Sequence, residues 1–277
     1  MRHTEKDEAY ADLCPSCNKV RMNEFCHHCG EQRQYWPDWS LAAFWNRYFA
    51  PLSTLDAPLY HTLWRLFNQP GQLTIDYWSG RRKPYLSPAQ LLLGFGLLFY
   101  LFFQQPNLFF EPWPVAGQPF PTGIGIAPLL TQKAAALELS PEQFIARFDA
   151  TGQTLSKILL LLGIPAFGWA LFRLYWFQYP YYLQHTVFAT HFLVVALACC
   201  IVLAPLTALP GGVPAILFGA LLVPVLSVYL YRALRHTYQQ GHWPALRHTG
   251  WLMGLWLLFI AFFLRPLTAI LTVLVLS

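Results

Sequence analysis

Residues 187–209, VFATHFLVVALACCIVLAPLTAL, contain no Asp, Glu, Lys or Arg from end to end. A helix needs roughly 20 mainly apolar residues to cross a hydrocarbon core about 30 Å thick. This stretch therefore predicts a transmembrane helix, and it sets the fold class to which the rest of the chain must conform.

The whole chain shares this character. Of its 277 residues, 56% are hydrophobic and only 11% are charged, whereas soluble domains carry about 25% charged residues. We predict an all-α integral membrane protein with about five transmembrane helices. The predicted spans are residues 88–103, 155–177, 187–209, 213–231 and 251–276.

Three regions are expected: a zinc ribbon over 1–34, juxtamembrane helices over 35–87, and a transmembrane bundle over 88–277 that includes an outer loop at 104–154. Residues 39–48 and 55–67 place aromatic residues and Leu among Arg and His. That pattern is typical of amphipathic helices in the headgroup region. Packing of the same two helices against the bundle is the alternative.

Two features stand out in the outer loop. Ser140, Pro141 and Gln143 have the spacing of a helix start, with an N-cap, a proline at the first helical position and a capping-box partner. Residues 111–125 are rich in Pro and Gly and are expected to be irregular. Residues 1–12 are polar and resemble no signal peptide, so the first span is expected to direct insertion.

Basic residues in short loops set the orientation of a membrane protein. They gather before the first span (Arg81, Arg82, Lys83), at the end of the second (Arg173) and after the fourth (Arg232, Arg235, Arg247). These loops lie on one side of the predicted topology. We therefore expect a cytoplasmic N-terminus and a C-terminus outside.

The strongest signal is a pair of Cys-x2-Cys motifs near the N-terminus, Cys14 with Cys17 and Cys26 with Cys29. Each motif can form a tight turn, or knuckle, that presents two thiolates. Two such knuckles complete a tetrahedral four-thiolate zinc site. Two disulfides are the alternative, but a reducing cytoplasm favours the metal. Four thiolates leave no open position for water, so the zinc is expected to be structural and to supply the folding energy of the ribbon.

The formal net charge of +5 does not imply nucleic acid as a partner. The first forty residues are slightly acidic and lack the basic face that binds phosphate backbones. The positive charge is instead assigned to the membrane surface. Arg81, Arg82 and Lys83 are expected to mark the inner side and to contact anionic lipid headgroups.

Residues 67–93, FNQPGQLTIDYWSGRRKPYLSPAQLLL, follow the ribbon, whose end has the pattern FC..CG at residues 25–30. Together they resemble a bacterial membrane family known as domain of unknown function three-six-six-seven. The resemblance continues in residues 181–192 and 229–241. It implies a ribbon joined to a polytopic bundle, located in the bacterial inner membrane, and no particular activity. Gln184 stands where relatives often have an acid, which argues against a carboxylate–histidine pair there.

Three polar residues fall within the apolar spans or next to one: His191 and Arg265 lie inside them, and His185 lies two residues before the third. The two histidines are six residues apart, about 240° around a helix, so they do not share a face. Arg265, followed by Pro266, either lines a polar cavity or lies near an interface and extends its side chain outward. These residues form the candidate intramembrane site.

The sequence thus favours a protein without enzymatic activity, whose zinc ribbon docks a protein partner or a second copy of the chain at the membrane. A transporter or channel for a small solute, ion or lipid is the alternative, with Arg265 and His191 along its path. An intramembrane enzyme would need His185, His191 and an acid to converge.

Overall fold

The computed structural model describes residues 13–21, 24–31, 58–102, 132–134, 140–208 and 213–276. The regular secondary structure in these ranges is helical, as expected. An isolated β-bridge pairs Leu13 with Val20. The predicted helix at 39–48 and the irregular segment at 111–125 lie outside the described residues. The longer elements are α3 (Leu59–Asn68), α4 (Gln72–Trp78), α5 (Pro88–Phe102), α7 (Pro141–Leu159), α8 (Gly163–Tyr175), α9 (Tyr182–Leu203), α10 (Val213–Thr237), α11 (His242–Phe259) and α12 (Arg265–Val275).

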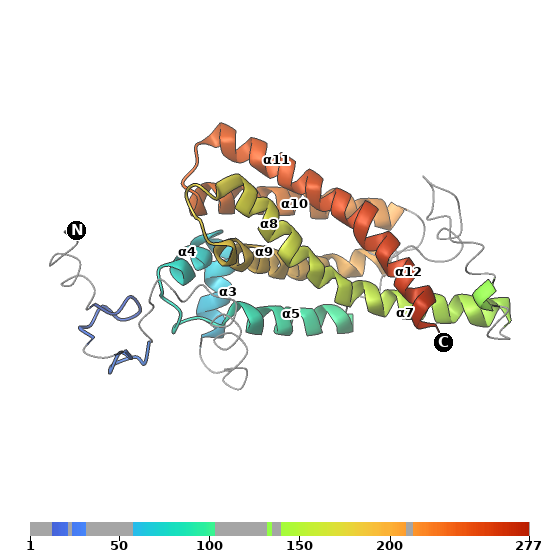
Figure 1. Ribbon diagram of the computed structural model, residues 1–277, viewed down its shortest axis with the longest axis horizontal. Coiled ribbons are helices and arrows are strands. Elements are labelled where there is room, and N and C mark those ends of the chain that lie inside the picture. Colours follow the sequence, from blue (N-terminus) through green and yellow to red (C-terminus); the bar gives the residue numbers. More distant parts are fainter. Residues whose placement is uncertain are drawn as a thin grey trace.

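The long helices run along one axis (Figure 1), and four of them are long and apolar enough to cross a membrane. Two of these four are composite. The 3₁₀ turn Leu160–Leu162 joins α7 to α8, and the π-helical turn Ile260–Leu264 joins α11 to α12. The shorter α5 is apolar but has 15 residues, about 22 Å of helix. The chain is therefore a multi-pass membrane protein, and its described residues contain four long apolar helices and a short one.

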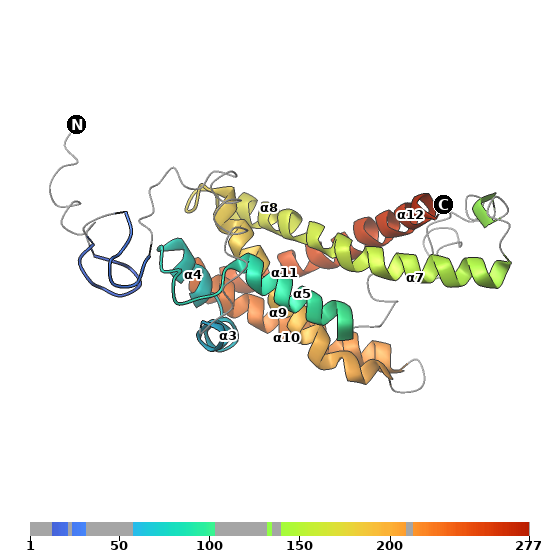
Figure 2. The same cartoon turned by 90° about the horizontal axis from the view of Figure 1, so that it is seen from below.

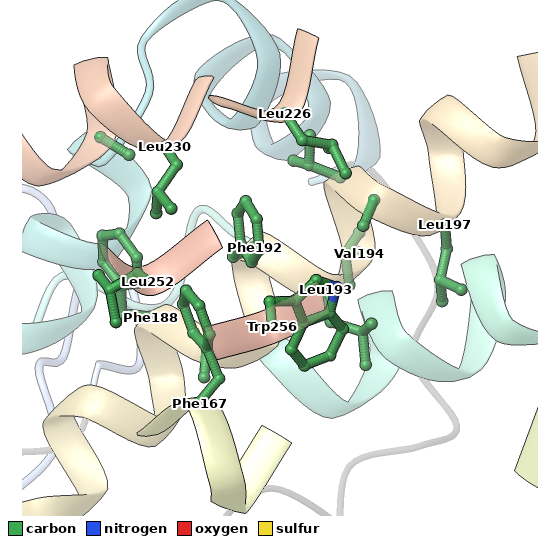
Figure 3. Close-up of a cluster of buried hydrophobic side chains, with 14 of the residues drawn as sticks. Phe167, Phe188, Phe192, Leu193, Val194, Leu197, Leu226, Leu230, Leu252 and Trp256 are labelled. Atoms are coloured by element: carbon green, nitrogen blue, oxygen red, sulfur yellow. The ribbon is translucent and has the colours of Figure 1, made fainter. Parts of the chain in front are cut away.

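The central helix is α9, which contains the stretch that predicted the fold. Nearly every residue from Leu183 to Ala198 is buried, because α5, α8 and α10 pack around it. Its aromatic residues meet those of neighbouring helices in one core (Figure 3): Phe192 stacks on Phe167 at 4.9 Å between ring centroids, and Trp256 meets Phe167 edge-on. The hydrophobic run is thus a buried helix surrounded by other helices.

The helices extend beyond the predicted spans. The second span was expected to begin at residue 155, but its helix starts at Pro141, where Ser140 and Gln143 form the expected capping box. An apolar window used to predict a span ends where charged residues begin, whereas the hydrogen-bonded backbone of the helix continues through them. The first part of this helix is amphipathic and packs on α12. The tight turn at Leu160–Leu162 precedes Pro165, whose missing N–H interrupts the regular α pattern.

One end of the bundle carries α3, α4 and the segment with the four N-terminal cysteines (residues 13–21 and 24–31), which we call the cysteine module. Figures 1 and 2 show α3 lying across the long helices at this end. Its Leu66 is 1% exposed and belongs to the core, while Trp64 is 52% exposed. Helix α3 therefore combines the two alternatives, packing with one face and presenting aromatic residues with the other.

The basic loops meet at the same end. The first residues of α5 and α11 and the last residues of α8 and α10 all lie at this end of the bundle (Figure 1). The structure thus gathers the three basic clusters on one side of the bundle.

Candidate metal centre and the membrane-entry segment

The four N-terminal cysteines come together through two similar turns. In the first, the backbone N–H of Asn18 donates to the carbonyl of Cys14 at 2.8 Å; in the second, Gly30 donates to Cys26 at 2.7 Å. Asn18 and Gly30 both have positive φ, 55° and 72°, a conformation that Gly and Asn tolerate best. The repeated spacing therefore yields two repeated knuckles.

The geometry of the thiols fits a metal ion. Their sulfur atoms all lie within 4.8 Å of one another. Cys14 Sγ is 3.5 Å from Cys29 Sγ, and Cys17 Sγ is 3.6 Å from Cys26 Sγ. Tetrahedral zinc, with Zn–S bonds of about 2.3 Å, requires sulfur separations of this size. All four thiols are free cysteines, so the alternative of two disulfides does not describe this arrangement.

The electrostatics of the thiols differ within the cluster. Hydrogen bonds from the backbone N–H groups of Cys29 and His28 lower the pKa of Cys26 to about 6, which favours the thiolate that a metal binds. Burial raises the pKa of Cys29 to about 12, and a bound cation reverses that preference. The adjacent His27 and His28 are exposed and do not belong to the cluster.

The carboxylate of Glu31 connects the cysteine module, through hydrogen bonds, to the basic loop just before α5 (Arg81 to Lys83). Glu31 Oε2 accepts hydrogen bonds from the Ser16 hydroxyl at 2.6 Å, the Arg82 N–H at 3.1 Å and the Lys83 N–H at 2.7 Å. Ser16 lies within the first knuckle, and Glu31 directly follows the second. Glu31 therefore connects both knuckles to the basic loop at the membrane entry.

A second carboxylate organises the helices behind this loop. Asp76 Oδ2 accepts the Tyr85 hydroxyl at 2.7 Å and lies 3.8 Å from Arg65 Nε. Arg65 Nε also donates to the Tyr85 oxygen at 3.2 Å. Gln72 donates to the other carboxylate oxygen at 2.8 Å. This network joins α3, α4 and the loop before α5, and burial and the nearby carboxylate raise the pKa of Tyr85 above its ordinary value.

The turn between α3 and α4 has a strict steric requirement at Gly71. Its φ is +87°, and a Cβ built on it would lie 2.8 Å from the Ala233 carbonyl and still closer to the Thr237 hydroxyl. Any other side chain would meet both a strained backbone and α10. The Pro70–Gly71 pair of the sequence motif is therefore a place where residues 58–87 pack tightly against α10.

Residues 56–100 match the model of the family described as protein of unknown function (DUF3667). This segment has the DUF3667 pattern. The expected family resemblance is therefore confirmed over α3, α4, the basic loop and most of α5. Comparisons with curated proteins and with solved structures gave no match. The carboxylate network and Gly71 all lie within the DUF3667 segment, and Glu31 reaches it from the cysteine module.

The expected intramembrane histidines lie in separate environments. His185 is held between the Tyr238 hydroxyl at 2.8 Å and the Tyr179 carbonyl at 3.0 Å. His191 contacts the Thr74 hydroxyl through Nδ1 at 2.9 Å. Within the described residues, neither histidine belongs to a cluster that could hold a metal. Each histidine therefore connects α9 to a different neighbour.

Arg265 lies elsewhere, in the wall of a cavity of about 320 Å³ between α9, α10 and α11. Its backbone N–H donates to Ile260, five residues back, in the π-helical turn, and Pro266 follows it. The other lining residues are overwhelmingly apolar, with Leu193, Leu222 and Trp256 among them. The structure therefore places a cation at an apolar cavity and does not bring it together with His185 or His191.

Glu31, Asp76 and Tyr85 were not identified from the sequence. Asp76 has a usable local signal, because Gln72 is one helical turn before it. Glu31 has a weaker local signal, which is its position directly after the second knuckle. Their main partners are far away in the chain, and only the fold brings them together.

Proposed function

We propose that the cysteine module is a zinc-stabilised docking module that holds the membrane-entry segment and presents a surface to another protein. The observation that carries this proposal is the set of three hydrogen bonds accepted by Glu31. A carboxylate that accepts two successive backbone N–H groups fixes the orientation of the module more firmly than a flexible surface ion pair does. The proposed role is assembly, without a chemical reaction of its own.

Three exposed apolar side chains on the module, which we call the apolar set, support the proposal of a protein partner. Leu13, Val20 and Phe25 are 46%, 54% and 56% exposed. Three large apolar side chains are many for so small a module, and rigid apolar groups of this kind commonly anchor protein interfaces. We infer a partner with a complementary apolar surface, supplied by a cytoplasmic protein or a second copy of the chain.

The proposed location of the module and the proposed metal are supported by the basic loops and by the four thiols. The basic loops gathered beside the module support a cytoplasmic location for this end and an inner-membrane location for the bundle. The reducing cytoplasm keeps the four thiols available for zinc. We propose zinc because it is the usual ion of closed four-cysteine sites.

Site-specific crosslinking tests this role. A photoreactive amino acid at Val20 in the full-length protein, expressed in cells, should capture a discrete partner or a second copy of the chain. The same probe at His28, which is exposed on the module but is not part of the apolar set, is the positional control. Cys26→Ser should abolish the Val20 crosslink by unfolding the module, and an unchanged crosslink in that variant contradicts the proposal.

A second function, translocation of an amphipathic solute, is favoured by the cavity at Arg265. An apolar cavity with one cation suits an anionic group attached to an apolar chain, and a π-helical turn beside it is a common feature of functional sites. Reconstituted protein should then move such a solute across vesicles, and Arg265→Leu should stop the flux. Absence of flux through the wild-type protein excludes this function, and equal flux in both proteins excludes a role for Arg265 in it.

A further inference from the structure

A second cavity, of about 520 Å³, lies where the module, α3 and the basic loop meet. Ser16 lines it from the module, His61, Trp64 and Arg65 line it from α3, and Arg81 and Tyr85 line it from the loop. Its volume is in the range of small-molecule sites. Its lining is mixed but contains several hydrogen-bond donors, in contrast to the largely apolar cavity at Arg265.

The positive charge of this cavity is only partly compensated. Arg65 faces Asp76 at 3.8 Å and shares Tyr85 with it. Arg81 is different: its Nε is buried and has no hydrogen-bond partner in the described part of the chain. A buried guanidinium N–H without a partner is costly, and the fork of an arginine matches the oxygens of a phosphate.

Aromatic residues place this cavity at the level of the headgroups. Tyr60 and Trp64 are 70% and 52% exposed and stack on each other on α3, and α5 begins a few residues after Arg81. Exposed Tyr and Trp beside basic residues are typical of the membrane interface. The Arg82 side chain is directed elsewhere, since its Nε donates to the Tyr77 carbonyl at 3.3 Å.

We propose that this cavity binds a phosphate group, with Arg81 as the main ligand and with Arg65 and His61 beside it. The phosphate belongs either to an anionic lipid headgroup or to a soluble phosphate compound, since both offer the same oxygens to the arginines. This site is independent of the protein partner proposed above, because it requires only the cavity and its charge.

The test uses the full-length protein in nanodiscs. In the lipid arm, nanodiscs of phosphatidylcholine with phosphatidylglycerol are compared with phosphatidylcholine alone, and native mass spectrometry measures the retained phosphatidylglycerol. In the soluble arm, inorganic phosphate replaces chloride at equal ionic strength in phosphatidylcholine nanodiscs, and the thermal stability is measured. Retention of phosphatidylglycerol identifies a lipid ligand, and stabilisation by phosphate identifies a soluble one.

Two variants and two controls decide the outcome. Arg81→Gln should weaken binding about tenfold through the loss of charge-assisted hydrogen bonds. His61→Glu should have a similar effect by adding a negative charge at an exposed position, so it remains informative if Arg81→Gln fails to fold. Arg235→Gln and Asn68→Glu make the same charge changes at exposed positions that do not line the cavity. Equal effects in variants and controls, or no binding of either probe, overturn the proposal.

Discussion

Glu31 Oε2 accepts the backbone N–H of Lys83 at 2.7 Å, across 52 positions of the chain. This contact joins the end of the cysteine module to the last basic residue before α5. It places a metal-dependent fold in direct contact with the start of the membrane bundle. The integrity of the module and the structure of the entry loop should therefore be coupled.

Glu31→Ala should loosen the module from the loop without unfolding either part. The substitution removes three hydrogen bonds to a buried, charged acceptor, each contributing about 1.5–3 kcal/mol. Amide hydrogen exchange at Arg82 and Lys83 should rise by about tenfold or more. Glu24→Ala, at an exposed position of the same module, should leave exchange unchanged. Slow exchange in Glu31→Ala would show that other contacts hold the module.

Metal analysis of the purified full-length protein should find one zinc ion per chain. Cys14→Ser should abolish zinc binding, because a three-thiolate site lacks the fourth ligand and the module has little core of its own. The helical content of the bundle should persist, since its core is separate. Cys199→Ser, within α9, is the matched control and should keep the zinc. Full zinc occupancy in Cys14→Ser would exclude the cluster as the metal site.

The sequence predicted those features that local rules determine. The spacing of Cys14 and Cys26 with their partners predicted the cluster, hydropathy predicted the long helices, and Ser140 with Gln143 predicted a helix start. The angular separation of His185 and His191 also predicted that they would face different neighbours. Each of these inferences needs only residues that are close in the chain.

Long-range pairing is what the sequence could not supply. Asp76 looked like one of several scattered acids, because nothing local indicates that Tyr85 and Arg65 converge on it. The position of Arg265 in a cavity wall depends on how α9, α10 and α11 pack. The predicted start of the second span, residue 155, was also too late, because hydropathy detects only the apolar part of the helix and α7 begins with polar residues.

Gly71→Ala should destabilise the protein substantially. The left-handed backbone costs an alanine about 1–2 kcal/mol, and its Cβ would collide with the carbonyl of Ala233. The control is Gly250→Ala, where a Cβ would meet nothing within 4 Å; there the helix should be unchanged or stabilised by about 0.5–1 kcal/mol. Thermal unfolding in detergent measures both. Equal melting temperatures for the two variants would contradict the described contact with α10.

Tyr85→Phe should change how stability depends on pH in alkaline solution. Burial and the Asp76 carboxylate raise the pKa of Tyr85 from its ordinary 10.0, so the folded state binds the phenolic proton more tightly than the unfolded state. The resulting stabilisation is fully present below pH 10 and is lost as the pH rises through the higher pKa of the folded state. The wild-type protein should therefore lose stability over this range more steeply than Tyr85→Phe. At neutral pH the variant should be about 1 kcal/mol less stable, because the hydrogen bond to Asp76 is missing. Tyr60→Phe, at a position 70% exposed, should follow the wild-type curve, and parallel curves for wild type and Tyr85→Phe would show that this hydroxyl is not coupled to folding.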